Sequence, residues 1–345
     1  MPLRTAHYIL CCAVFLFGSA NAADRIALAV PLDGPFELLG KQAIAGAQAA
    51  AKALGKSLTV VDDGCDTDAG PTLASAIAAA KPEIAIGFLC LESLNGALPA
   101  LKKNNVPALS IAARADALTL KKAKTGNLFR RIAPRDGMEA EALAKYLLPL
   151  WRETNFAIID DGTIQARDLV ESFRQAAAEA GLKPVFSDTF RPGLEKQNAL
   201  ASRLQKAGAT HVLFGGSIDD AVILSRDAKD YGGLTLALGE SALPSEPQTA
   251  HGPILALALP DFTLLPESAA AKLAIEAEGV LPDTYSLLAY AAVEIAAASE
   301  GGGPFATAAG TIAFTPAGDL ADNPFRLAEL KNGVYVSITA NPEGQ

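Results

Sequence analysis

The chain has 345 residues, of which half are hydrophobic, 19% are charged and only 6% are aromatic, and its formal net charge is −9. This apolar content excludes an intrinsically disordered protein, and the length suits two α/β domains better than one. An acidic balance without a basic patch argues against nucleic acid and anionic membrane surfaces as partners.

The first 22 residues have the pattern of a secretory signal peptide. Arg4 supplies the positive charge, and the run from Ile9 to Phe17 is apolar but far shorter than the roughly 20 residues of a membrane span. Ala20-Asn21-Ala22 then offers small residues at the positions that signal peptidase reads, so we expect cleavage after Ala22. A buried N-terminal strand or an anchor is the alternative. The sequence therefore predicts an exported, soluble protein.

Export changes what the cysteines imply. Two of the four lie in the signal peptide, so the exported chain keeps only Cys65 and Cys90. An even pair in an oxidising compartment predicts a disulfide, and two buried free thiols are the alternative. The disulfide would close a loop of about 25 residues, which the chain-entropy model values at roughly 3 kcal/mol. Because the chain has only three histidines, we expect no Cys/His metal site.

Strands and helices alternate through the first part of the exported chain. Each expected strand is a near-continuous apolar run, which indicates a strand covered on both faces, and the joints are short and rich in Gly or Pro. This order is typical of a parallel, doubly wound sheet. The expected strands are 25–32, 57–62, 83–90 and 107–113, and the expected helices are one ending near Leu54, 71–80 and 92–104.

The same alternation restarts after Pro134 and predicts a second Rossmann-like unit. Its expected strands are 155–160, 184–190, 211–216 and 234–239, and its expected helices are 138–151, 164–180, 199–207 and 219–230.

The rest of the chain departs from this alternation and predicts two lobes that exchange segments. Its expected elements are a strand at 254–259, helices at 268–278 and 284–299, a short strand at 311–314, and a hairpin of 326–330 and 334–338 that turns at Asn332-Gly333. Lobe 1 is expected to contain 23–131 plus 258–310, and lobe 2 to contain 132–257 plus 311–345. About three crossovers, near Ile132, Leu257 and Thr311, would join them. A ligand would bind between the lobes, at the carboxyl ends of the strands.

Several motifs occur along the chain in an order that is specific as a set. They are Gly34-Pro35 with Gly40, Asp62-Asp63-Gly64-Cys65, Gly87-Phe88-Leu89-Cys90, Ser110 to Thr119, Phe129-Arg130-Arg131, Gly215-Gly216, and Leu288 to Ala292. With the closing hairpin, this set resembles the leucine/isoleucine/valine-type (branched-chain amino acid) periplasmic binding proteins of ABC transporters. The resemblance begins at about Asp24 and implies the type I periplasmic-binding fold.

The resemblance implies a periplasmic, substrate-binding component of an ABC transporter. Such a protein would bind a small amino-acid-like solute between two closing lobes and deliver it to a permease in the inner membrane. We expect a monomer that has no cofactor. An exported sensor of the same fold that reports to a receptor is the alternative. A serine hydrolase is disfavoured because Gly215-Gly216-Ser217-Ile218-Asp219 lacks the last glycine of Gly-x-Ser-x-Gly, and we expect no enzyme.

The resemblance also implies a ligand-binding shell in the first lobe. The family holds the ligand carboxylate with a Ser and a Thr, and these positions are Leu91 and Arg114 here, with Ser93 as a partial substitute for the serine. The backbone carbonyl of Ala112 would accept a hydrogen bond from the ligand's ammonium group. Arg114 suits an extra acidic group on the ligand or a salt bridge between the lobes, and an exposed position near the rim is the alternative.

In the second lobe, positions that are often Tyr in the family correspond to Gln165 and Ser217. Glu240 corresponds to the acidic residue that meets the ligand's ammonium group. A carboxylate in a closing cleft needs a partner, and a cationic ligand nitrogen would supply one, although a surface position near a turn is the alternative. Ser217, like Ser93 in the first lobe, has the position of an N-cap residue, so capping is as good an explanation as ligand contact.

Overall fold

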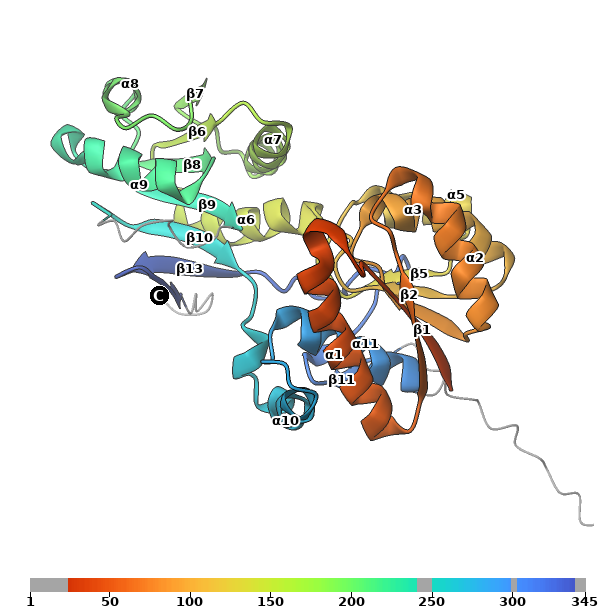
Figure 1. The fold of residues 1–345 in the computed structure, drawn as a ribbon. Coiled ribbons are helices and arrows are strands. Elements are labelled where there is room, and N and C mark those ends of the chain that lie inside the picture. The colour runs from red at the N-terminus through yellow and green to blue at the C-terminus, as the bar shows by residue number, and fades with distance from the viewer. Residues whose placement is uncertain (1–23, 241–249, 299–302, 339–345) are drawn as a thin grey trace, which may run out of the picture.

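The computed structural model describes residues 24–240, 250–298 and 303–338, which form two α/β lobes beside each other (Figure 1). The predicted signal peptide lies outside the described residues. One lobe contains a five-stranded sheet and the other a seven-stranded sheet. The two doubly wound lobes confirm the predicted fold class.

The sheet of lobe 1 is parallel throughout and has the strand order β2-β1-β3-β4-β5. Strand β1, which lies between β2 and β3, is buried from Ile26 to Val30, as its continuous apolar sequence predicts. The strands are β1 (Arg25–Val30), β2 (Ser57–Asp62), β3 (Ile84–Gly87), β4 (Ala108–Ser110) and β5 (Phe129–Arg131). The helices are α1 (Glu37–Leu54), α2 (Gly70–Ala80), α3 (Leu91–Lys103), α4 (Ala117–Leu120) and α5 (Lys122–Thr125).

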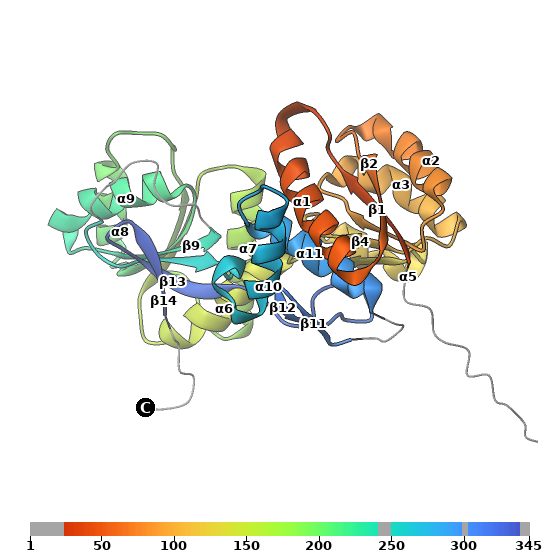
Figure 2. The ribbon, with the colours of Figure 1, turned by 60° about the horizontal axis from the view of Figure 1, so that its bottom comes forward.

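Two later helices, α10 (Ala269–Ala277) and α11 (Thr284–Ala297), return to lobe 1, and α11 packs along α1 (Figure 2). The two helices lie so close that a Cβ atom at Gly46 would stand 1.8 Å from the carbonyl oxygen of Ser286. The antiparallel hairpin of β11 (Phe305–Thr307) and β12 (Gly310–Ile312) follows α11.

The sheet of lobe 2 has the order β14-β13-β10-β9-β8-β6-β7. Its first five strands in the sequence pair in parallel, and the closing hairpin of β13 and β14 adds to β10 in the antiparallel sense. The strands are β6 (Phe156–Asp160), β7 (Phe186–Thr189), β8 (His211–Gly215), β9 (Thr235–Glu240), β10 (Ile254–Ala258), β13 (Arg326–Lys331) and β14 (Val334–Ser337). The helices are α6 (Gly137–Leu150), α7 (Ile164–Glu179), α8 (Asn198–Lys206) and α9 (Ile218–Asp227).

Within the described residues, the chain passes between the two lobes three times, after β5, after β10 and before β13. The predicted crossover positions and lobe boundaries stay predictions. The sequence analysis did not predict β5, the short helices α4 and α5, or β11. These elements have three or four residues each, too few to show a periodic pattern.

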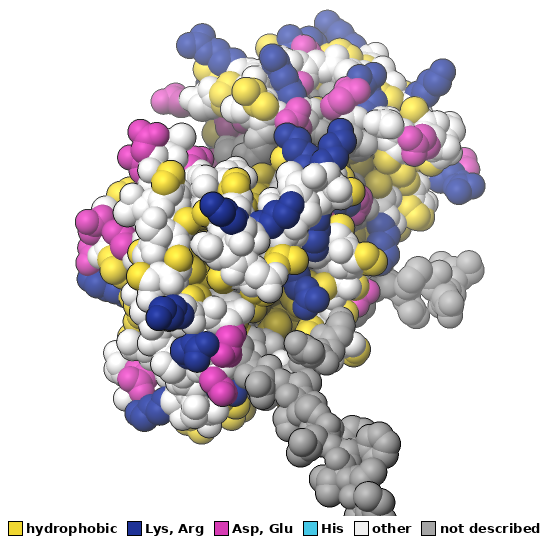
Figure 3. Space-filling view, turned by 90° about the vertical axis from the view of Figure 1, so that its right-hand side faces the viewer, with side chains coloured by type: hydrophobic (Ala, Val, Ile, Leu, Met, Phe, Trp, Pro, Cys, Tyr) yellow, Lys and Arg dark blue, Asp and Glu magenta, His cyan; other side chains and the backbone are white. Residues whose placement is uncertain are grey.

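Two further observations concern the helices and one face of lobe 1. Among the helices of the described residues, none is both long enough and apolar enough to cross a membrane. On the face of lobe 1 seen in Figure 3, several Lys and Arg side chains lie across the middle, and most Asp and Glu side chains lie toward the margins.

Candidate functional site

An ion pair joins the two lobes across the cleft. Arg114 follows β4 of lobe 1, and its Nη1 contacts Oε2 of Glu240, which ends β9 of lobe 2. The side chains are 28% and 33% exposed. Both residues line two cavities. One, of about 880 Å³, extends toward the hinge, which is the set of three segments that connect the lobes, and we call it the hinge-side cavity. The other, of about 860 Å³, lies between α6, α7 and lobe 1. Of the two roles that the sequence suggested for Arg114, this structure shows the salt bridge between the lobes.

The loop that carries Arg114 is held firmly by lobe 1. At its start, the hydroxyl of Ser110 accepts the N–H groups of Ala112 and Ala113 at 3.2 and 2.8 Å and donates to the carbonyl of Phe88 at 2.9 Å. Beneath it, the fully buried Arg131 donates to the carbonyl of Ala115 at 2.9 Å. The loop therefore directs the Arg114 side chain into the cleft.

The guanidinium of Arg114 has donors to spare. Its Nε lies 3.6 Å from Oδ1 of Asp136 and has no hydrogen-bond partner, although the atom is buried. The group also stands over the ring of Phe325 at 5.4 Å, a cation–π distance. A ligand carboxylate that reached Nε would supply the missing acceptor, because a guanidinium binds carboxylates through two adjacent N–H groups.

The side of the cleft formed by α6 is acidic. Oε1 of Glu139 accepts the backbone N–H of Glu240 at 2.7 Å. Burial raises the pKa of Glu139, and the neighbouring carboxylates of Glu240 and Asp136 add to the increase, while the Glu240 N–H and Arg114 oppose it. This side of the cleft therefore favours a ligand that brings positive charge, or one whose carboxylate replaces a protein carboxylate at Arg114.

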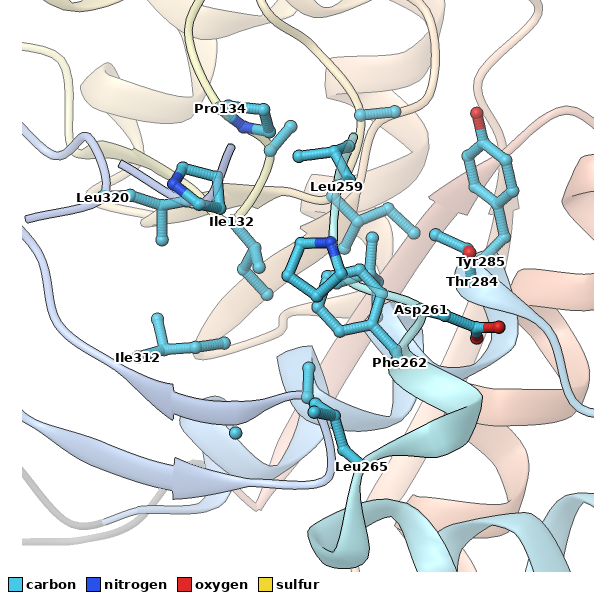
Figure 4. A pocket seen from close by; sticks show the side chains of 18 of the residues that line it. Ile132, Pro134, Leu259, Asp261, Phe262, Leu265, Thr284, Tyr285, Ile312 and Leu320 are labelled. Atoms are coloured by element: carbon cyan, nitrogen blue, oxygen red, sulfur yellow. The ribbon is translucent and has the colours of Figure 1, made fainter. Parts of the chain in front are cut away.

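The hinge-side cavity has a largely apolar lining (Figure 4). Phe262 and Leu265 come from the segment after β10, and Tyr285 lies in the first turn of α11. Burial raises the pKa of the Tyr285 hydroxyl, and the negative charges of Asp283 and Glu240 raise it further, so the phenol is neutral and available as a donor.

The predicted site residues divide into two groups by position. Arg114, Glu240 and Ala112 line the hinge-side cavity, and Gln165, in the first turn of α7, lines the cavity between α6 and α7 with Arg114 and Glu240. The predicted ligand contacts of Ala112 and Gln165 remain predictions.

Ser93 and Ser217 line neither cavity. Ser93 is fully buried, and its hydroxyl donates to the carbonyl of Cys90 at 3.3 Å. Ser217 caps α9, because its hydroxyl accepts the N–H of Asp220 at 3.1 Å and donates to the Asp220 carboxylate at 2.7 Å. Both hydroxyls thus have local partners in this structure, and their ligand contacts are untested.

The predicted disulfide between Cys65 and Cys90 is present, with the two Cα atoms 5.1 Å apart. It joins the loop after β2 to the residue before α3. The carboxylate of the fully buried Asp63 accepts the N–H of Cys65 at 3.1 Å, and burial raises its pKa. The loop after β2 and the start of α3 therefore form one fixed edge of lobe 1.

Sequence reasoning missed four residues that surround the ion pair, namely Asp136, Glu139, Tyr285 and Phe325. A signal was present for one of them, because Asp283 and Ser286 form a capping box that marks the start of α11 beside Tyr285. That signal marks a helix start but says nothing of its position in the cleft.

Comparison with known proteins shows which family this chain belongs to. A model of the periplasmic binding protein family matches residues 25–326. The Leu/Ile/Val-binding protein homolog 3 of Brucella melitensis biotype 1 is 28% identical over 370 positions, which cover 98% of this chain and 100% of that relative.

Two solved structures share the fold. A putative branched-chain amino acid ABC transporter protein from Rhodospirillum rubrum has a TM-score of 0.76 and 17% identity, over 92% of this chain and 100% of that one. A solute-binding protein of an ABC transporter from R. palustris, solved with benzoate, has a TM-score of 0.58 and 16% identity, over 92% and 95% of the two chains. The family match extends over both lobes and the hinge, and the chain belongs to the periplasmic binding protein family.

Proposed function

We propose that this protein is the substrate-binding component of an ABC transporter, that it captures a small amino-acid-like solute between its lobes, and that it delivers the solute to a membrane permease. The observation that carries the proposal is the ion pair of Arg114 and Glu240, which sets one cationic and one anionic group from opposite lobes in one cleft. The family and the Leu/Ile/Val-binding relative support the solute class. The signal-peptide pattern supports a periplasmic location.

The mechanism follows from the two lobes and the three passages between them. The ligand first meets lobe 1, where Arg114 is held in place by its loop, and lobe 2 then closes over it. A ligand carboxylate binds Arg114, and a ligand ammonium group binds Glu240. The contact between the two residues is thus replaced by contacts of each residue with the ligand. Closure excludes water from the cleft, which strengthens each polar contact. The closed form is the one that a permease would recognise.

A thermal-shift screen of refolded, ligand-stripped protein tests the proposal. A ligand at about 100 times its dissociation constant should add about 2.7 kcal/mol of stability and raise the melting temperature by a few degrees. We expect hits among amino acids, and Glu240→Gln should abolish them. Glu153→Gln is the matched control, because Glu153 is an exposed glutamate of lobe 2 outside both cavities.

Other outcomes of the screen have separate meanings. Hits among acids that lack an amine would keep the binding function and make Arg114 the main ligand contact. A well-folded protein that responds to no amino acid, amide, dicarboxylate, sugar or polyamine would contradict the proposed transport function.

A further inference from the structure

The hinge-side cavity is larger than is needed to bind the charged groups of an amino acid at Arg114 and Glu240. Its volume is about 880 Å³, within the range of roughly 300–1,000 Å³ found for pockets that bind drug-sized molecules. Arg114 and Glu240 occupy only one part of its lining. The remaining lining extends to the segments that connect the lobes, with Ile132 before α6, Phe262 and Leu265 after β10, and Ile312 in β12 (Figure 4).

These lining residues leave apolar surface facing the cavity. Phe262, Leu265 and Leu320 are half-buried, while Ile132 and Ile312 are each 5% exposed and form its floor. Covering apolar surface that faces the cavity with an apolar group of a ligand is favourable, because that surface is then removed from water. The chemistry of this region therefore fits the hydrocarbon part of a ligand.

Much of the apolar lining of this cavity belongs to lobe 1. Ile132 and Ile312 belong to the buried core cluster of lobe 1, and Phe262 and Leu320 pack against the same cluster. Because the floor and much of the wall move together with lobe 1, rotation of lobe 2 changes the mouth of the cavity near Glu240 more than its interior.

We propose that the natural ligand is amphipathic, with a charged head at Arg114 and Glu240 and an apolar body, longer than a leucine side chain, that lies in the hinge-side cavity. This inference rests on the proposed function and specifies its solute. The charged pair fixes the head, and the cavity is continuous with that pair, so the body extends from the head toward Phe262 and Leu265. An occupant in this position contacts all three segments between the lobes.

Calorimetric titration of the full, ligand-stripped protein with a homologous series tests this inference. The series is L-alanine, norvaline, norleucine, 2-aminoheptanoate and 2-aminooctanoate, with L-leucine and L-phenylalanine beside it. Each added methylene should tighten binding about fourfold as long as it enters apolar surroundings. We expect affinity to rise beyond norleucine, and a maximum at leucine or norleucine followed by a decline would overturn the inference.

A pair of adjacent leucines supplies matched variants. Leu265 lines the cavity, whereas Leu264 beside it is 79% exposed and does not. Leu265→Trp fills the inner end of the cavity and should lower the ratio of 2-aminooctanoate to norvaline affinity at least tenfold. Leu264→Trp should leave that ratio unchanged. An equal effect of the two variants, or none from Leu265→Trp, would place the ligand body elsewhere and refute the inference.

The series separates failure of the inference from failure of the proposed function. If short members bind and longer ones do not, the transport function stands and the long apolar body is wrong. If no member binds and no other solute stabilises the protein, the proposed function itself fails. Tighter binding of a solute without an apolar body than of any member of the series would also refute the inference.

Discussion

Two arginines near one loop differ sharply in their surroundings. Arg131, at the end of β5, is fully buried, and its Nε lies 2.6 Å from Oδ1 of Asp319, which is 11% exposed. Its guanidinium also donates to the carbonyl of Ala115 and to the hydroxyl of Thr119 at 2.6 Å. Arg114 lies on the loop after β4, which Arg131 supports. It is partly exposed, and its Nε lacks a hydrogen-bond partner.

The difference shows how the protein separates support from recognition. Arg131 donates four hydrogen bonds, from its three side-chain nitrogens, to groups of lobe 1 and of the segment before β13, so it cannot change partners without leaving a buried charge. Arg114 contacts a residue of the other lobe and retains free donors, so it can change partners when the lobes move or a ligand enters. The first pair fixes the loop, and the second belongs to the moving cleft.

Breaking the buried pair should have the largest effect on stability. Asp319→Ala leaves the Arg131 charge buried without its partner, and we expect a loss of about 3–5 kcal/mol in the free energy of unfolding. Glu240→Ala removes the partner of Arg114 and should cost under about 1 kcal/mol, because water reaches that pair. Urea unfolding of both variants measures the contrast, and similar losses would mean that the two pairs do not differ as proposed.

Removing the disulfide should have the next largest effect. The Cys65→Ser/Cys90→Ser double variant should lose about 3 kcal/mol of stability, since the bridge closes a loop with a sequence separation of 25. Affinity for the ligand should stay within about threefold at temperatures where the variant is folded, because the disulfide supports lobe 1 outside both cavities. A much larger loss of affinity would show that this fixed edge of lobe 1 takes part in recognition.

A double-mutant cycle on Arg114→Ala and Glu240→Ala should give a coupling free energy smaller than the stability losses expected for the buried pair and the disulfide. We expect a coupling of at most about 1 kcal/mol in the ligand-free protein, and 1 M NaCl should reduce it because salt screens exposed pairs. The same cycle on Arg131 and Asp319 should change little with salt. A salt-insensitive coupling at Arg114 would indicate that the cleft pair is shielded from water.

The smallest effect should come from Glu139. Because burial raises its pKa in the folded protein, the folded state holds this proton more tightly than the unfolded state does. Stability from this group is therefore lost as the pH rises from the ordinary carboxyl range of about 4 through the raised pKa. Glu139→Gln keeps the oxygen that accepts the Glu240 N–H and removes the charge.

This variant should be more stable than the parent at pH 7, by less than about 1 kcal/mol, and the two proteins should converge at low pH. Urea unfolding at several values between pH 4 and 7 would measure the difference. A variant that is less stable at pH 7 would mean that the Glu139 charge interacts favourably with Arg114 more than burial penalises it.

Much of the fold could be predicted from the sequence, because it depends on local patterns. Apolar runs such as Ile26 to Val30 predicted strands covered on both faces, and Asn332-Gly333 predicted the turn of the last hairpin. The carboxyl ends of the parallel strands predicted where the cleft lies, and the resemblance to the family implied that Arg114 and Glu240 lie in it. The pair Cys65 and Cys90 was predicted from its number and compartment, and it is bridged.

The sequence by itself thus determined the two α/β lobes, the positions of their main strands along the chain, the disulfide and the edge of each sheet that faces the cleft. Only the tertiary structure decided that Arg114 pairs with Glu240, that Arg131 is buried beneath its loop, and that Phe262, Tyr285 and Ile312 line one cavity. Periodicity and turn residues act within a few positions of the chain, so sequence reveals them. Contacts between segments more than a hundred residues apart depend on how whole lobes pack, which no local pattern records.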